Sequence, residues 1–158
     1  MTALMLAVQS DSEHREACKK LNLEPSDKYL QIIDILIENE ADVNLENKDK
    51  YTALILAASE GNLPVVEKLL KVPGIKIDHQ NKFGKSALFN ASEFGKFACV
   101  ECLVQNGANV NLPSGRGLSM AMLAAVKKHS DILRYLIENK ADLKIKGKTD
   151  DVSLSRHI

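Results

Sequence analysis

The sequence predicts an all-α solenoid, in which antiparallel pairs of helices stack side by side and are joined by β-hairpin-like turns. Two observations support this fold class: three separate segments recur in a fixed order along the chain, and the apolar residues are almost all aliphatic. Aromatic residues make up 4% of the 158 residues, and Trp is absent. The core must therefore be built from Leu, Ile, Val and Ala, whose small side chains let helices approach closely.

The first recurring segment is a short apolar stretch that begins with Thr or Ser. A hydroxyl at this position accepts a hydrogen bond from a backbone N–H in the first helical turn. The Leu and Ala residues that follow lie on one face of a helix, and Gly61 or Gly95 then permits the left-handed backbone that closes it. The segment therefore predicts a short first helix in each unit. Its four copies are Thr2-Ala-Leu-Met-Leu-Ala-Val8, Thr52-Ala-Leu-Ile-Leu-Ala-Ala58, Ser86-Ala-Leu-Phe-Asn-Ala-Ser92 and Ser119-Met-Ala-Met-Leu-Ala-Ala125.

A second and a third segment follow each copy of the first. The second carries apolar pairs and predicts a second helix, and the third is rich in Asn and Asp and predicts a turn with an extended hairpin. Because no single unit can bury its apolar face alone, stacking must supply the core. The second segments are Ile32-Ile-Asp-Ile-Leu-Ile37, Val65-Val-Glu-Lys-Leu-Leu70, Cys99-Val-Glu-Cys-Leu-Val104 and Ile132-Leu-Arg-Tyr-Leu-Ile137. The third segments are Ala41-Asp-Val-Asn44, Ala108-Asn-Val-Asn111, Ala141-Asp-Leu-Lys144 and the looser Ile75-Lys-Ile-Asp78.

This pattern resembles the ankyrin repeat, whose first helix opens with T-P-L-H-x-A-A and whose tail reads G-A-D-V-N. The resemblance covers essentially the whole chain, which we interpret as a single ankyrin-repeat domain over 1–158. The family's Pro is absent throughout, and Lys50 and Lys128 stand where the repeat has turn glycines. The expected repeats are 1–46, 47–80, 81–113 and 114–146, followed by a partial repeat or cap at 147–158.

The first repeat contains an insert between its two helices, at about 12–28. Thirty residues separate Thr2 from Ile32, whereas 13 separate Thr52 from Val65, so the insert adds 17 residues. The stretch up to Leu21 could extend the first helix, but insertions in solenoids usually leave the stack as loops. We therefore favour a surface excursion over a dedicated binding element. The incomplete ends are consistent either with a longer array or with the insert and the tail acting as caps.

Composition argues against several classes of partner. Lys plus Arg and Asp plus Glu are equal, at 21 each, so the formal net charge is zero. Nucleic-acid binding and attachment to anionic membranes usually need a basic excess, and no apolar run approaches the roughly 20 residues that span a bilayer. Three cysteines form no disulfide framework and the N-terminus does not read as a signal peptide, so we expect a reducing, cytoplasmic location.

Candidate catalytic and metal-binding residues have simpler structural interpretations. Cys99 and Cys102 form a C-x-x-C, but Cys99 occupies the slot of Val65 and Ile132, which is a core position. No second Cys/His pair completes a metal site, and there is no phosphate-cradling glycine loop. We therefore expect no enzyme activity, cofactor or metal. The four histidines are scattered, at His14, His79, His129 and His157.

The resemblance to the ankyrin repeat implies that a partner docks on the hairpin tips and on the concave face of the first helices. Four apolar or aromatic candidates fall at slots expected to face water, although each could instead pack onto the neighbouring repeat. Phe89, in the slot of the family's His, is expected to be half-buried. The predicted partner-binding residues are Lys48, Asp49, Tyr51, Phe83, Lys85, Phe94, Arg116 and Leu118.

The predicted function is a non-catalytic protein–protein interaction module, acting as a scaffold, adaptor or regulator. The expected partner is another protein, with no nucleic acid, membrane or small-molecule substrate. Two alternatives remain open because the fold does not determine the function. One is an ankyrin-type inhibitor that covers a partner enzyme, and the other is the targeting fragment of a larger enzyme or effector.

Overall fold

The computed structural model describes residues 1–22 and 27–144, which contain eight helices and no strand. Residues 147–158, predicted to form a partial repeat or cap, lie outside the described residues. The helices are α1 (Ala3–Leu21), α2 (Lys28–Glu38), α3 (Ala53–Glu60), α4 (Leu63–Leu70), α5 (Ala87–Glu93), α6 (Phe97–Gln105), α7 (Met120–Val126) and α8 (Ser130–Glu138).

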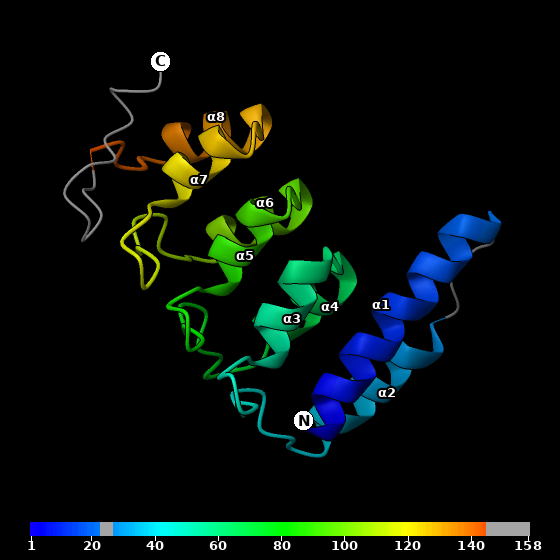
Figure 1. The fold of residues 1–158 in the computed structure, drawn as a ribbon. Coiled ribbons are helices and arrows are strands. Elements are labelled where there is room, and N and C mark those ends of the chain that lie inside the picture. The colour runs from blue at the N-terminus through cyan, green and yellow to red at the C-terminus, as the bar shows by residue number, and fades with distance from the viewer. Residues whose placement is uncertain (23–26, 145–158) are drawn as a thin grey trace.

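The helices form pairs that stack in sequence order, so the predicted all-α ankyrin-type solenoid is confirmed (Figure 1). Each odd-numbered helix packs against the even-numbered helix that follows it. Contacts between successive pairs run from α1 to α3, α5 and α7 in one layer, and from α2 to α4, α6 and α8 in the other. The turns between pairs gather along one edge of the stack, to the left in Figure 1.

Hydroxyl caps begin the first helix of every pair, as the recurring Thr or Ser predicts. The side-chain oxygens of Thr2, Thr52, Ser86 and Ser119 accept a hydrogen bond from the backbone N–H three residues later, at 3.1–3.4 Å. Each cap residue has an extended backbone, as is typical of a residue that directly precedes a helix. The cap therefore sets where each first helix begins.

Compact hairpin turns precede α3, α5 and α7, although none is assigned as a strand within the described residues. In the first two, the side-chain oxygens of Asn47 and Asn81 each accept two backbone hydrogen bonds, at 2.9 and 3.0 Å. Lys50 (φ 60°) and Lys128 (φ 61°) adopt the left-handed backbone that their glycine slots require. We name the three turns 47–51, 81–85 and 114–118 together the tip surface.

The core is aliphatic, as the composition predicts, and its largest buried side chain is Phe89. Phe89 is 2% exposed, so the expectation that it is half-buried is wrong. The first pair leaves part of its outer face open: Ile32 is 44% exposed, whereas its counterparts Val65, Cys99 and Ile132 are at most 1% exposed. Neighbouring pairs cover those counterparts, while no described helix packs on the outer side of α1 and α2.

The insert does not leave the stack as a loop over its first ten residues. α1 continues as a regular helix to Leu21 and ends at Asn22, whose left-handed backbone (φ 53°) closes it. The loop expectation is therefore wrong here, and the alternative of an extended first helix is right. The physical reason is that the continued helix is anchored and partly buried: Cys18 is buried, and Asp11 and Ser12 at the start of the extension accept hydrogen bonds from Asn62 of the second helix pair.

Candidate functional site

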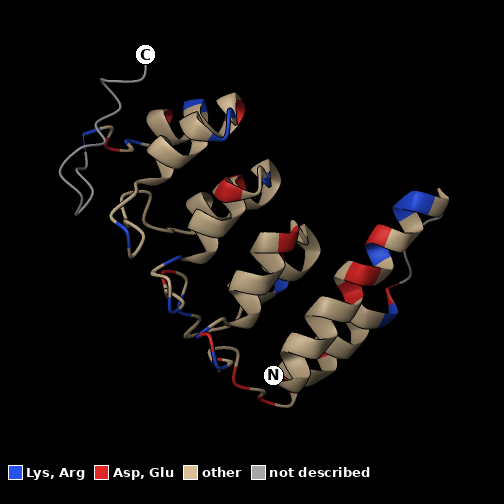
Figure 2. Ribbon diagram, in the orientation of Figure 1, with Lys and Arg blue, Asp and Glu red and all other residues tan. Residues whose placement is uncertain are grey.

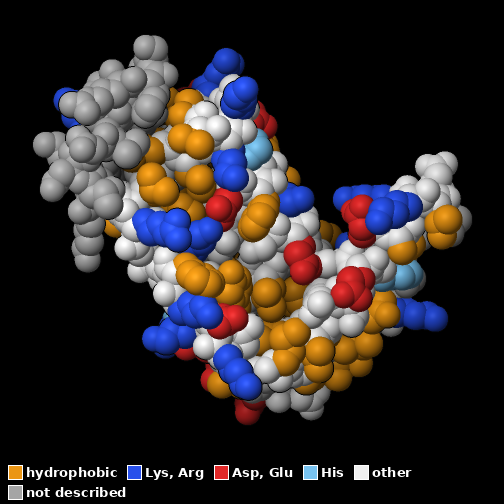
Figure 3. Space-filling model, in the orientation of Figure 1, with side chains coloured by type: hydrophobic (Ala, Val, Ile, Leu, Met, Phe, Trp, Pro, Cys, Tyr) orange, Lys and Arg blue, Asp and Glu red, His pale blue; other side chains and the backbone are white. Residues whose placement is uncertain are grey.

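A groove between neighbouring hairpin turns brings together five of the eight predicted partner-binding residues. It has a volume of about 320 Å³, which is near the lower end of the range for ligand pockets. Figure 3 shows the surrounding face, on which hydrophobic side chains lie between groups of Lys and Arg. The five predicted residues are Tyr51, Phe83, Lys85, Arg116 and Leu118, and the lining is completed by Phe89, Glu93, Ser114 and Leu123.

The remaining predicted residues lie outside this groove. Lys48 and Asp49 belong to the turn that precedes α3, and Asp49 forms an ion pair with Lys82 of the next turn. Phe94 follows the last residue of α5 as its C-terminal cap. The structure therefore divides the predicted set into five residues that line the groove and three that lie outside it.

Exposure separates the four apolar candidates into two kinds. Phe83 and Phe94 are 51% and 55% exposed, as predicted. Tyr51 and Leu118 are half-buried and pack against the core, so the expectation that they face water is wrong in part. Each directly precedes a helix cap, and a side chain at that position typically folds back onto the first helical turn.

Charge pairing orders the polar side chains of the groove. Lys85 Nζ lies 2.6 Å from Glu93 Oε2, and 5.7 Å from the centre of the Phe89 ring. Lys82 Nζ lies 4.9 Å from the centre of the Phe83 ring, above an exposed aromatic face. These contacts combine ion pairs with cation–π attraction, and they hold the lysine side chains over the aromatic residues.

Backbone hydrogen bonds connect successive turns and make the tip surface continuous. Lys82 N–H donates to Asp49 O at 3.0 Å, and Gly115 N–H donates to Phe83 O at 3.1 Å. The Gln80 side chain bridges the same region by donating to Gly84 O (2.7 Å) and Pro113 O (2.8 Å). A surface already ordered in this way loses little conformational entropy when a partner binds.

Comparison with known families identifies this architecture. The family described as "Ankyrin repeats (3 copies)" matches residues 1–81 and 54–147, which together span most of the chain. The chain belongs to the ankyrin-repeat family. Ankyrin repeats indicate a protein–protein interaction module, and they are generally non-catalytic.

Several curated ankyrin-repeat proteins are similar to the chain. An ankyrin repeat and KH domain-containing protein of Caenorhabditis briggsae is 34% identical over 85% of this chain, which covers 5% of that protein. A putative ankyrin repeat protein of Acanthamoeba polyphaga mimivirus is 32% identical over 81% of this chain and 80% of its own length. A protein named palmitoyltransferase AKR1, from Lachancea kluyveri, is 29% identical over 72% of this chain and 16% of its own length. The ankyrin chain thus spans only a small part of some relatives.

The C-x-x-C of the third ankyrin helix pair has the features of a packing element. Cys99 is 1% exposed, and Cys102 is half-buried on the same helix, α6. Burial raises the pKa of the Cys99 thiol to about 11, and it also raises the pKa of Cys102. A redox or nucleophilic cysteine needs the opposite shift, because the thiolate is the reactive form. The structure thus supports the interpretation of Cys99 as a core residue.

Thiol labelling should distinguish these two cysteines. At pH 8 a thiol of pKa about 11 is ionised to roughly one part in a thousand, and Cys99 is also buried whereas Cys102 is half-buried, so iodoacetamide should modify Cys102 faster than Cys99. Peptide mapping by mass spectrometry measures both rates.

Replacing both Cys99 and Cys102 by Val should leave the circular dichroism spectrum and partner capture unchanged. Loss of capture by a folded double variant would show that the C-x-x-C takes part in binding.

Histidines make local structural contacts in this ankyrin domain. His79 Nε2 lies 3.1 Å from Lys50 O and 3.3 Å from Glu46 Oε1, and His129 Nε2 lies 3.3 Å from Glu93 O. His157 is outside the described residues.

Within residues 1–22 and 27–144, no group of three or more His, Cys, Asp or Glu side chains is placed to hold a metal ion. No helix in the same ranges has both the length and the apolar character needed to span a bilayer.

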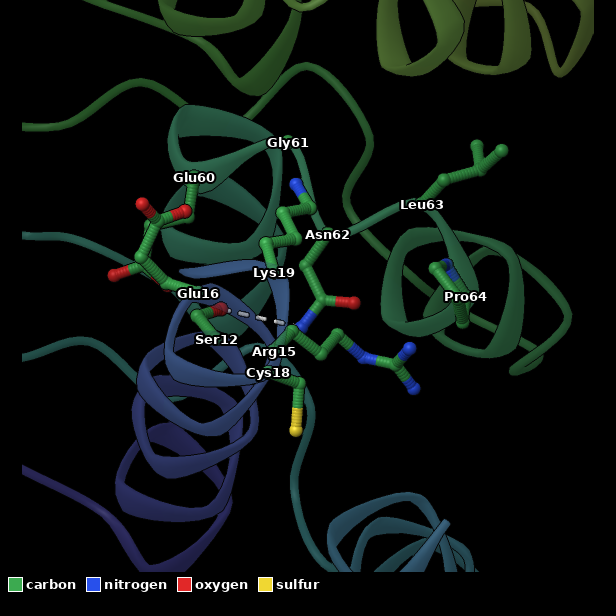
Figure 4. A pocket seen from close by; sticks show the side chains of 10 residues that line it. All are labelled: Ser12, Arg15, Glu16, Cys18, Lys19, Glu60, Gly61, Asn62, Leu63 and Pro64. Carbon is green, nitrogen blue, oxygen red and sulfur yellow. Dashed lines mark hydrogen bonds between the residues drawn. The ribbon is translucent and has the colours of Figure 1, made fainter. Parts of the chain in front are cut away.

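A second pocket, of about 270 Å³, lies between the extended part of α1 and the turn that joins α3 to α4 (Figure 4). Asp11 is fully buried there, and its Oδ2 accepts from Arg15 Nε (2.7 Å) and from Asn62 Nδ2 (2.6 Å). Asn62 Nδ2 also donates to Ser12 Oγ at 3.1 Å, as the dashed line in Figure 4 shows. Burial raises the pKa of the neighbouring Glu60 carboxyl. The cluster holds the α1 extension against the second helix pair.

Sequence reasoning did not predict two contacts at these sites. One is the pair between Lys85 and Glu93: Lys85 lies before α5 and the two residues are eight positions apart, so no helical spacing predicts the contact. Asp11 and Asn62 are 51 residues apart. The one available signal was that the position of Asn62, directly before the second helix of its pair, is also polar in the next two pairs, where Lys96 and His129 occupy it.

Proposed function

We propose that this chain is a non-catalytic protein-binding module that engages another protein through the tip surface and the adjoining first helices. The observation that supports it best is the groove, which combines an exposed aromatic ring, Phe83, with the guanidinium of Arg116 beside half-buried Tyr51 and Leu118. Aromatic residues and Arg are enriched at interaction hot spots. Exposed apolar surface of this kind also marks binding sites.

Within this proposal, the chain acts as a scaffold, adaptor or regulator. A second candidate is the targeting part of a larger enzyme, because one similar protein is named a palmitoyltransferase, of which this chain covers 16%. An inhibitor that covers a partner enzyme would use the same surface. The captured partner distinguishes an inhibitor from a scaffold. A partner enzyme whose activity falls on binding indicates an inhibitor, and a partner whose activity is unchanged indicates a scaffold.

Two further expectations accompany the proposal. The repeat limits 1–46, 47–80, 81–113 and 114–146 are retained as proposed units of this module. A reducing, cytoplasmic location is proposed as well, supported by the three free thiols, Cys18, Cys99 and Cys102.

The test is capture of partners from source-cell lysate by the wild-type chain and by Phe83→Ala/Phe94→Ala/Arg116→Ala. All three side chains are exposed, so their truncation should leave the fold intact, whereas Tyr51 is half-buried and is left unchanged. Loss of several hot-spot contacts should reduce capture at least about tenfold, measured by quantitative mass spectrometry.

The matched control is Ile35→Ala/Ile137→Ala/Arg134→Ala. It also removes two exposed apolar side chains and one exposed Arg, but from the second-helix layer. Circular dichroism must first show that both triple variants are folded. If the control loses the partner and the tip variant keeps it, the interface lies on the outer helices and the proposed site is wrong.

A further inference from the structure

The tip surface is basic although the whole chain is neutral. Its 15 residues contain five cations and a single acid, Asp49, whereas the chain as a whole has 21 basic and 21 acidic residues. Figure 2 shows Lys and Arg recurring along the turns on this edge of the stack. The cations are Lys48, Lys50, Lys82, Lys85 and Arg116.

The acids near this surface are already paired. Asp49 binds Lys82, Glu93 binds Lys85 at 2.6 Å, and Glu46 faces His79 at 3.3 Å. In contrast, Lys48, Lys50 and Arg116 are exposed and carry no ion pair to any other described residue. Positive charge is therefore left over at both ends of the tip surface, on the turn before α3 and on the turn before α7.

The groove lies between these two ends. Its rim carries Lys85 and Arg116, and its apolar lining comes from Phe83, Phe89 and Leu118. A volume of about 320 Å³ suits one large apolar side chain of a partner rather than a folded element. Backbone hydrogen bonds join the neighbouring turns into a continuous surface. An extended segment that places such a side chain in the groove would therefore lie against the neighbouring turns as well.

We propose that the partner presents an extended acidic segment, which inserts one large apolar side chain into the groove between Phe83 and Arg116 and pairs its flanking carboxylates with Arg116 at one end and with Lys48 and Lys50 at the other. This inference rests on the proposed protein-binding function and names the chemistry of the partner. Charge complementarity selects this occupant, since a basic or neutral segment leaves these cations without partners.

The test selects random linear peptides displayed on phage against the immobilised wild-type chain. Enriched peptides should contain one Leu, Ile, Met or aromatic residue flanked by Asp or Glu. A synthetic copy of one such peptide, with a fluorophore, is then titrated by anisotropy at low and at high salt. Its affinity should fall at least about tenfold as salt screens the charges, and also when its apolar residue is replaced by Ala.

Two charge reversals provide the matched comparison. Arg116→Glu should lower the affinity for the peptide at least about tenfold, because it replaces attraction of the peptide's carboxylates by repulsion beside the groove. Arg134→Glu makes the same change on α8, in the outer layer, and should alter the affinity by less than about twofold. Equal effects of the two reversals would overturn the proposed placement.

Failure of this inference is distinguishable from failure of the proposed function. Enriched peptides that are neutral or basic, or no enrichment at all, would overturn the proposal that the partner presents an acidic segment. The function would still stand if Phe83→Ala/Phe94→Ala/Arg116→Ala lost a lysate partner that the outer-layer control kept. If that capture experiment also failed, the function itself would be wrong.

Discussion

Replacing Gly84 by Ala should lower the free energy of unfolding by about 2–5 kcal/mol. Gly84 has φ +69°, a left-handed backbone that costs a residue with a Cβ about 1–2 kcal/mol. An added Cβ would also lie 2.2 Å from Gly115 N and 2.5 Å from Gly115 Cα, both backbone atoms of the next turn. Relieving such an overlap typically costs a further 1–3 kcal/mol or so. Urea denaturation followed by circular dichroism measures the change.

Gly74→Ala is the matched control for this prediction. Gly74 also has a left-handed backbone, at φ +81°, but an added Cβ would meet no atom within 4 Å. Its replacement should therefore cost only the conformational part, about 1–2 kcal/mol. Equal losses in the two variants would show that the turns before α5 and α7 can separate without penalty. Gly84→Ala should also weaken partner capture, because a shift of the two turns would displace Phe83 and Arg116, which line the groove.

Replacing Asp11 by Ala should destabilise the domain by about 2–4 kcal/mol. Removal of one member of a buried ion pair typically costs 3–5 kcal/mol or so, because the remaining charge loses its partner. We expect slightly less here, since the Arg15 side chain is 19% exposed and retains some contact with water. The substitution also removes the hydrogen bond that Asn62 donates to Asp11, so the α1 extension should separate from the turn after α3. Urea denaturation gives the stability, and limited proteolysis near Leu21 reports the release.

Asp34→Ala provides the comparison for Asp11→Ala. Asp34 pairs with Lys68 at the same distance, 2.7 Å, but the two side chains are 43% and 30% exposed. Pairs in contact with water contribute about 0–1 kcal/mol, so this variant should lose at most that amount. A comparable loss in both variants would mean that burial does not govern the strength of these pairs.

Local chemistry made the repeating parts of the fold predictable. Thr52 and Ser86 cap their helices, and Lys50 adopts the left-handed backbone of a turn glycine, because each depends on residues within one turn of the chain. The aliphatic core was predictable for a related reason, since the apolar positions recur with the helix. Of the candidate site, Phe83 and Arg116 could be named because they occupy slots of the repeat that packing does not use.

Contacts between distant residues could not be obtained in this way. Tyr51 was expected to face water, but it packs against the core, and the ion pair between Lys85 and Glu93 was not predicted. The insert was expected to be a loop, but it continues α1 because Asp11 and Asn62, 51 residues apart, meet in the stack. The contact between Asp11 and Asn62 depends on how the first two helix pairs approach each other, which local spacing does not reveal.

The sequence by itself determined the ankyrin repeat, its helix caps, its turns and the neutral overall charge, because these follow from local spacing and composition. Only the tertiary structure decided that five predicted residues line one groove, that the acids around it are already paired, and that the α1 extension is held by a buried polar cluster. The physical reason is that these properties depend on contacts that form only in the folded stack, and some of them, such as Asp49 with Lys82 and Asp11 with Asn62, join residues of different repeats.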